Sequence, residues 1–142
     1  MKKLIILSSS TLFILFAVLS SCTSQTTSSA GENAMIDSGN GTVTVYYFHG
    51  ERRCVTCKAV GKVSKETIES SFADNPNVKF LDINIDEPEN NELKDKMEMS
   101  GSGLFIYNGK VKEDLTAIAF QKAVDHPEEL AEKIISTVNQ LL

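Results

Sequence analysis

Two cysteines, Cys54 and Cys57, are separated by two residues and follow a run of β-branched and aromatic residues. Two thiols at this spacing can close a small disulfide ring when they open a helix. At a helix N-terminus, unpaired amide N–H groups and the helix dipole favour the thiolate of the first cysteine. The neighbouring Arg52, Arg53 and Lys58 add positive charge at the same end. The spacing therefore predicts a dithiol–disulfide centre.

The first residues of the chain have the pattern of a bacterial export signal. A basic start is followed by a mostly apolar stretch at 4–19 that serines and a threonine interrupt. A membrane span needs about 20 apolar residues, so an export signal is the better interpretation. The stretch ends in Leu19-Ser20-Ser21-Cys22, which resembles the bacterial lipobox. We therefore expect a lipoprotein signal peptide at 1–21 and a lipidated Cys22; the alternative is an ordinary signal peptide with Cys22 as a free thiol.

The compartment follows from the signal. Lipid on Cys22 would hold the protein to one face of a membrane, and the location expected is the bacterial cell envelope outside the cytoplasm, with the periplasm favoured. Disulfides persist there, and acylation of Cys22 leaves Cys54 and Cys57 as a pair. A bridge across two residues closes a very small loop and stabilises little, which argues against a purely structural disulfide. Loss of Lys2 and Lys3 would shift the net charge from −5 to about −7, so no nucleic-acid partner is expected.

The rest of the chain divides into a tether and one domain. Residues 22–41, from the lipidated cysteine onward, are rich in Ser, Thr, Gly and Asn and predict a flexible tether. The domain is expected over 42–142. Its expected elements, in chain order, are a strand at 42–49, a helix at 54–72, a strand at 78–85, a helix at 87–99, a hairpin of 104–107 with 110–117 around Asn108-Gly109, and a helix from 126 or 127 to 141. Residues 117–124 fit either a strand or a short helix, and Asp125 with Glu128 predicts a capping box.

This order of elements, β-α-β-α-β-β-α, predicts an α/β fold with a mixed central sheet. The first two strands should be parallel because a helix connects them, and the last two should form an antiparallel hairpin. The order and the position of the two cysteines resemble the thioredoxin superfamily over nearly all of 42–142. The run from Tyr46 to Cys57 more closely resembles small exported thioredoxin-like lipoproteins of the ArsF type.

The resemblance implies a thiol–disulfide oxidoreductase. Cys54 would attack a substrate disulfide and Cys57 would resolve the mixed disulfide. Cys54 should then be exposed, with its pKa lowered to about 3.5–7.5. Arg53, Lys58 and His49 are the residues expected to tune the pKa of the thiols. The expected partner is an exported protein with a thiol or disulfide, or a membrane redox protein, and no cofactor is expected.

Two departures from the family pattern affect what the resemblance implies. The dipeptide between the cysteines is Val-Thr rather than Gly-Pro, and Arg53 replaces a tryptophan, so the direction of electron flow stays open. The loop expected to contact substrate contains Ser100, Gly101 and Ser102, where family members have a cis-proline. A cis bond before a residue other than proline costs about 2.5–4 kcal/mol, so this loop is expected to be trans.

Two other functions use the same residues. A soft-metal or metalloid carrier would bind through Cys54 and Cys57, helped by His49, Met97 or Met99. A tetrahedral zinc site needs four ligands, so two cysteines alone favour a two-coordinate metal, and no metal-ligand set is predicted. Methionines at helical spacing are more often core residues. The third function is an adaptor that uses neither thiol.

The remaining polar residues are expected to have structural positions. Asp82, Asp86 and Glu87 should lie on a solvated strand edge, and His126 should lie beside the start of the last helix. Glu51 is expected in a solvated loop, with a role as proton acceptor as the alternative.

Overall fold

The computed structural model describes residues 41–142. The predicted signal peptide at 1–21, the lipidated Cys22 and residues 23–40 of the predicted tether lie outside the described residues. Within 41–142, no helix has both the length and the apolar character that crossing a membrane requires.

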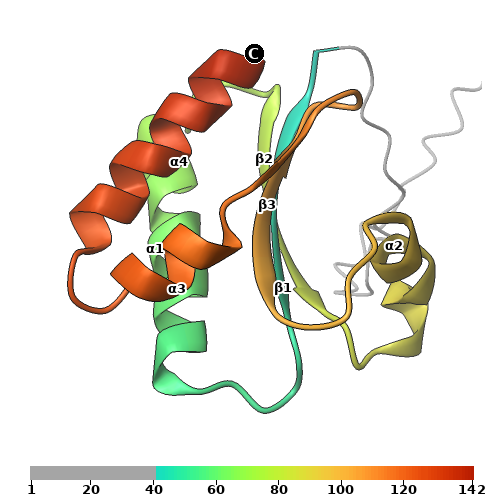
Figure 1. Ribbon diagram of the computed structural model, residues 1–142. Coiled ribbons are helices and arrows are strands. Elements are labelled where there is room, and N and C mark those ends of the chain that lie inside the picture. The colour runs from blue at the N-terminus through green and yellow to red at the C-terminus, as the bar shows by residue number, and fades with distance from the viewer. Residues whose placement is uncertain (1–40) are drawn as a thin grey trace, which may run out of the picture. The chain divides into compact units, whose positions relative to one another are not determined.

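A four-stranded mixed sheet forms the centre of the domain (Figure 1). Its strands are β1 (Val43–His49), β2 (Val78–Asn84), β3 (Gly103–Tyr107) and β4 (Lys112–Asp114), in the spatial order β2-β1-β3-β4. β1 pairs in parallel with β2, whereas the β1–β3 and β3–β4 pairs are antiparallel. β1 is therefore central, and all seven of its residues are buried. An almost unbroken apolar run is typical of a strand covered on both faces.

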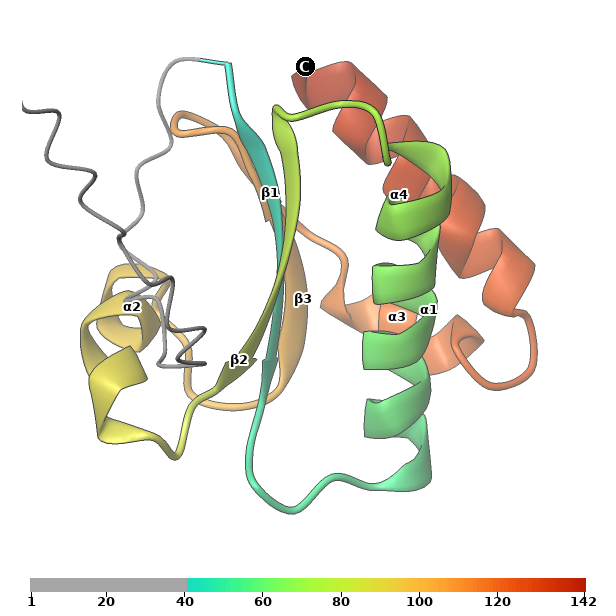
Figure 2. The ribbon, with the colours of Figure 1, turned by 180° about the vertical axis from the view of Figure 1, so that it is seen from behind.

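Helices cover both faces of the sheet (Figure 2). One face carries α1 (Val55–Ser71), α3 (Thr116–Lys122) and α4 (Pro127–Leu141), while the other face carries α2 (Asn91–Lys96) and the 3₁₀ turn η1 (Pro88–Asn90). The result is a three-layer α/β domain, and it confirms the predicted α/β fold of the thioredoxin-like type.

The side chains of β1 alternate between two apolar clusters, because successive residues of a strand point to opposite faces. The larger cluster lies beneath α1, α3 and α4, and its fully buried members are Val43, Val45, Tyr47, Val60, Leu104, Ile106, Ala119, Leu130, Ile134 and Val138. The smaller cluster lies beneath α2 and consists of Tyr46, Phe48, Ile83, Leu93, Met97 and Phe105. The two clusters pack against both faces of β1 at the centre of the sheet, and the cysteine-bearing loop leaves from its end.

The structure corrects three boundaries. The helix expected at 87–99 is instead η1 followed by α2, which ends at Lys96. Glu98 has a φ of 57°, a left-handed conformation that turns the chain toward β3. The strand expected to begin at residue 110 begins at Lys112, because Oδ1 of Asn108 accepts hydrogen bonds from the backbone N–H groups of Lys110 and Val111.

The end of the hairpin also differs from the prediction. The second strand stops at Asp114, and the ambiguous segment 117–124 lies largely in α3, which adds a helix to the predicted order. Oδ1 of Asp114 accepts from the backbone N–H of Thr116 at the start of that helix. The capping box predicted for Asp125 and Glu128 is wrong: His126 is the N-cap residue of α4, and no side-chain hydrogen bond caps the helix.

Candidate functional site

Cys54 occupies the N-cap position of α1, and Val55 is the first residue of that helix. The Sγ atom of Cys54 accepts a hydrogen bond from the backbone N–H of Cys57 at 3.2 Å. An N-cap side chain normally supplies such an acceptor because the first amides of a helix have no partner within it. Cys54 is exposed and Cys57 is half-buried. The helix therefore presents one sulfur to solvent and keeps the other behind it.

The two thiols are free and their Sγ atoms lie 2.7 Å apart. The hydrogen bond from the Cys57 thiol, followed by that from the Cys57 backbone N–H, lowers the pKa of Cys54. Burial raises the pKa of Cys57, and the hydrogen bond with Cys54 raises it further. The outer thiol consequently ionises first, with the inner thiol as the donor that stabilises its charge. This asymmetry is what a nucleophilic thiol with a resolving partner requires.

Tyr47 lies beneath this pair. It is fully buried, and its hydroxyl donates a hydrogen bond to the backbone carbonyl of Cys57 at 2.5 Å. Burial raises the pKa of Tyr47 to about 12, and the negative charge of a Cys57 thiolate would raise it in the same direction. The phenol therefore keeps its proton and remains a donor throughout the range in which the thiols titrate.

Gly61 allows the Tyr47 ring to lie against α1. A Cβ atom at Gly61 would be only 2.7 Å from Cε1 of Tyr47, closer than real side chains approach. In the sequence this glycine is a weak point of the helix, because glycine costs about 1 kcal/mol relative to alanine in a helix interior. Its position is explained by the close contact with the tyrosine, which in turn contacts Cys57.

The loop between β1 and α1 is attached to β2 through Asp82. Nε2 of His49 lies 2.7 Å from one carboxylate oxygen of Asp82, and Nη1 of Arg53 lies 3.4 Å from the other. Nδ1 of His49 lies 2.8 Å from the carbonyl oxygen of Gly50. His49 is buried and its ring is tilted against that of Tyr47, with the centroids 5.4 Å apart. One carboxylate thus connects both ends of the loop to the sheet.

A second carboxylate holds the middle of the same loop. Oδ2 of Asp86 accepts from the backbone N–H of Glu51 at 2.8 Å. The backbone N–H of Ile85 donates to the carbonyl of His49 at 2.8 Å, which extends the β1–β2 pairing by one bond. The carboxyl end of β2 and the turn after it therefore form the support on which the cysteine loop rests.

The structure brings Cys54, Cys57, His49 and Arg53 to one end of the sheet, but their contacts differ from those expected. Hydrogen bonds within the cysteine motif are the largest causes of the lowered pKa of Cys54, and Arg53 contacts Asp82. Lys58 is exposed on the first turn of α1. Tuning of the thiols by Arg53, Lys58 and His49 stays a prediction.

Tyr47 and Asp82 are the two residues that sequence reasoning missed. Asp82 and Asp86 are exposed, and Asp82 lies on the edge strand β2, as expected; the sequence did not predict that both also contact the cysteine loop. The pairing register, which places Tyr47 opposite Asp82 on the parallel strand, is the signal that connects them. That register cannot be read without knowing how the two strands align.

The loop with Ser100, Gly101 and Ser102 precedes β3. Gly103 pairs with Phe48 in the register of β1 and β3, so the loop lies at the end of the sheet where β1 leads into the cysteine loop. Its role in substrate contact stays a prediction. Met97, one of the possible soft-metal ligands, is a buried member of the smaller apolar cluster, and Met99 packs against that cluster.

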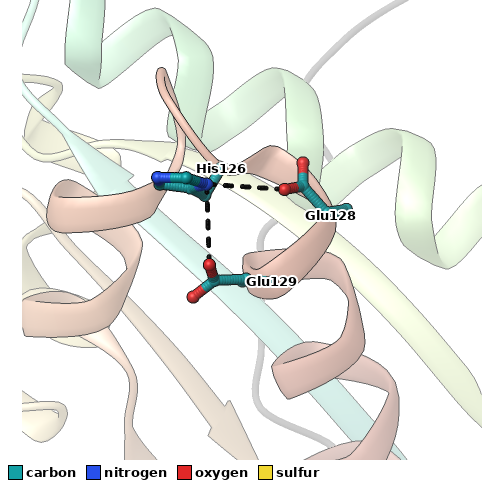
Figure 3. Close-up of side chains that lie close together, drawn as sticks. All are labelled: His126, Glu128 and Glu129. Atoms are coloured by element: carbon teal, nitrogen blue, oxygen red, sulfur yellow. Dashed lines mark ion pairs between the residues drawn. The ribbon is translucent and has the colours of Figure 1, made fainter.

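Among the described residues, 41–142, no third His, Cys, Asp or Glu ligand atom lies close enough to the two cysteines to share an ion with them. Within residues 41–142, the only group of three His, Cys, Asp or Glu ligand atoms close enough to share an ion is His126, Glu128 and Glu129 (Figure 3). Two sulfurs bound to one zinc at about 2.3 Å would be about 3.8 Å apart in a tetrahedral site, so this pair, at 2.7 Å, would have to separate to hold the ion. The two-coordinate soft-metal alternative, which needs no third ligand, stays a prediction.

The group at His126 has a structural explanation. It is exposed and lies where α4 begins, with Nδ1 of His126 at 3.6 Å from Glu128 and 3.5 Å from Glu129. Glu129 also binds Lys122 at 2.7 Å, and that hydrogen bond lowers the pKa of Glu129. Carboxylates in the first turn of a helix are favourable because of the helix dipole. These contacts tie α3 to the start of α4.

Comparison with known proteins leaves the function to be argued from the site. Among solved structures, a chain described as a malarial protein is similar at 19% identity and a TM-score of 0.38, over 56% of this chain and 93% of that chain. No protein-family model matches the chain, and no curated protein matches it.

Proposed function

We propose that this protein is a thiol–disulfide exchange protein that uses Cys54 and Cys57. The observation that carries the proposal is the pair itself: an exposed thiol of lowered pKa, 2.7 Å from a half-buried thiol of raised pKa, at the start of a helix. A thiolate is the attacking species in exchange, and it must be accessible. The position of the pair after a central buried strand, in a thioredoxin-like α/β fold, supports the same proposal.

The exchange step balances within the pair. The Cys54 thiolate attacks one sulfur of a substrate disulfide, so that a Cys54–substrate disulfide forms and the substrate bond breaks. The departing thiolate takes a proton from water. Cys57 then gives its proton to water and its sulfur attacks Sγ of Cys54, so that the Cys54–Cys57 disulfide forms, the Cys54–substrate bond breaks, and the second substrate sulfur leaves as a thiolate that takes up a proton. Two electrons have passed from the dithiol to the substrate; the reverse sequence oxidises a substrate dithiol.

The place of action follows from the N-terminal sequence. We propose that Cys22 is lipidated after cleavage of residues 1–21, and that the domain therefore acts on a membrane face in the bacterial cell envelope. Its partner would be an exported protein with a thiol or disulfide, or a redox protein of that membrane. Incorporation of labelled palmitate tests the anchor: the wild-type chain should incorporate label and C22S should not. Label in C22S would disprove lipidation at Cys22.

A redox titration of the full chain in detergent tests the exchange function. The protein is equilibrated in thiol–disulfide buffers between about −120 and −300 mV, and its free cysteines are counted by alkylation and mass. We expect a reversible two-electron transition that disappears in both C54S and C57S. C22S is the matched control, because it changes the cysteine outside the pair and should keep the transition.

Trapping separates exchange from the other functions. C57S should accumulate mixed disulfides through Cys54, because the resolving thiol is missing, whereas C54S should accumulate none. A wild-type chain without a reversible transition, together with a C57S chain without trapped disulfides, would contradict the proposal. Bound metal in the same mass spectrum, lost in both variants, would then favour the soft-metal carrier.

A further inference from the structure

The arginines of this chain are unusually placed. The sequence contains only two, Arg52 and Arg53, and they directly precede Cys54. Lys58 follows in the first turn of α1, so cations lie on both sides of the attacking cysteine in an otherwise acidic chain of net charge −5. Arginine binds a carboxylate through a planar pair of N–H donors, whereas lysine carries a point charge on a flexible side chain.

These three cations differ in whether a carboxylate lies close enough to form an ion pair with them. Arg53 has a side chain 34% exposed and reaches Asp82 only at 3.4 Å. Arg52 and Lys58 are exposed, and neither forms an ion pair with any residue between 41 and 142. Glu51 is the acidic side chain of the same loop, exposed and three residues before Cys54. Two cations, two residues before and four residues after Cys54 in the sequence, therefore have no carboxylate partner within residues 41–142.

An exposed apolar side chain lies in the same segment as these cations. Val55, the residue directly after Cys54, is 77% exposed although it is a valine. Residues 51–55 are all exposed, so the chain before and after Cys54 offers two arginines, one glutamate and one apolar side chain to solvent. A thiolate by itself repels a substrate that carries carboxylates, and nearby cations reverse that repulsion.

We propose that the surface formed by Arg52, Arg53, Val55 and Lys58 receives disulfides or thiols that carry carboxylates next to the reacting sulfur. The inference rests on the exchange function proposed above and names its substrate class. An acidic polypeptide segment and a small carboxylate disulfide share this chemistry. The chemical step is the one already described, and only the recognition of the substrate is new.

Exchange rates with three similar disulfides test the inference. The reduced full chain is mixed at low salt with dithiodipropionate, which is anionic, with hydroxyethyl disulfide, which is neutral, or with cystamine, which is cationic. Formation of the Cys54–Cys57 disulfide is followed by quenching and mass. Each rate is compared between wild type and the double variant R52Q/K58Q, because that ratio cancels the intrinsic reactivity of each leaving thiol.

The double variant should slow exchange with dithiodipropionate by about tenfold, change hydroxyethyl disulfide less than about twofold and speed exchange with cystamine. The differences should shrink at 1 M salt, where the screening length is about 3 Å. K62Q/K65Q is the matched control. It removes two cations further along α1, which pair with Glu66 and Glu69, and should leave all three rates unchanged.

Two results would overturn the inference, and they are distinguishable. Equal rate ratios for the three disulfides, with exchange still present, would reject the charge selectivity and leave the exchange function standing. Failure of the wild type to react even with hydroxyethyl disulfide would reject the exchange function and this inference with it. If selectivity holds, a peptide disulfide flanked by Glu separates the two sources of substrate. A larger loss of rate in R52Q/K58Q than dithiodipropionate shows identifies a polypeptide substrate. An equal loss identifies a small molecule.

Discussion

Nε2 of His49, the last residue of β1, lies 2.7 Å from a carboxylate oxygen of Asp82 on the neighbouring strand. The other ring nitrogen, Nδ1, faces the carbonyl of Gly50 at 2.8 Å. Both acceptors are oxygens, so both contacts are hydrogen bonds when each nitrogen carries a hydrogen. His49 is buried, whereas the Asp82 side chain is 43% exposed. The partly exposed carboxylate of Asp82 therefore accepts a hydrogen bond from the buried ring of His49, directly beside the cysteine loop.

Replacing Asp82 with alanine should destabilise the domain. The change leaves a buried imidazole nitrogen without its acceptor, which typically costs about 1–3 kcal/mol. Urea denaturation followed by circular dichroism measures the loss. D74A is the matched control, because Asp74 is exposed in a turn and forms no hydrogen bond or ion pair with its side chain within residues 41–142; it should change stability by less than about 0.5 kcal/mol. Equal stability of D82A and wild type would show that the contact contributes nothing.

Removing the Tyr47 hydroxyl should affect the thiols as well as stability. Y47F loses the hydrogen bond to the Cys57 carbonyl and should cost about 1 kcal/mol. Y107F provides the control, since it loses an equivalent bond to the carbonyl of Gly109. Both variants should be destabilised to a similar degree, but only Y47F should shift the midpoint of the thiol–disulfide transition. A shift in both, or in neither, would contradict a specific role for Tyr47.

The buried phenol also predicts a dependence of stability on pH. The pKa of Tyr47 is raised from 10.0 to about 12, chiefly by burial. Between those values the unfolded chain has lost a proton that the folded chain retains, so stability falls as the pH rises from 10 to 12. The difference in unfolding free energy between wild type and Y47F, measured across this range, isolates the effect. A constant difference would show that Tyr47 does not titrate in this way.

The inner thiol should control the reactivity of the outer one. The hydrogen bond from Cys57 is the largest cause of the lowered pKa of Cys54, so C57A should move the onset of Cys54 alkylation to higher pH. C57S is the matched control, because a hydroxyl can still donate and should preserve part of the lowering. Iodoacetamide rates across pH, with mass mapping of the labelled cysteine, measure both. In the wild type, Cys54 should be labelled before Cys57.

A substitution at Gly61 should reverse the usual effect of helix propensity. Alanine is favoured over glycine in a helix by about 1 kcal/mol, but here its Cβ would lie 2.7 Å from the buried Tyr47 ring. Overpacking of this kind typically costs about 1–3 kcal/mol, so G61A should lower the free energy of unfolding. G101A tests the reasoning, because a Cβ there meets nothing within 4 Å and stability should hardly change. A more stable G61A would mean that the ring moves aside freely.

Much of the fold was predictable from local patterns. The buried strand, the cysteines at the start of a helix and the final amphipathic helix were predicted to within a few residues, because hydrophobic periodicity and caps act over short distances. The hairpin was predicted from Asn108-Gly109, and the strands do form it, but as a longer loop: Gly109 has a φ of 90°, whereas Asn108 lacks the positive φ that a two-residue turn requires at both positions. The exact start of β4 was not, because it depends on which amides the Asn108 side chain binds.

By itself, then, the sequence determined the order of elements, the cysteine spacing and the charges around Cys54. Tertiary structure alone decided that Asp82 holds His49 and Arg53, that Tyr47 reaches Cys57, and that Gly61 makes room for the ring. These contacts join residues distant in the chain, and they depend on the register of β1 with β2 and on how α1 packs on the sheet. The hydrogen bond from Cys57 lowers the pKa of Cys54 and burial raises the pKa of Cys57, so the structure distinguishes two thiols that are chemically identical in the sequence.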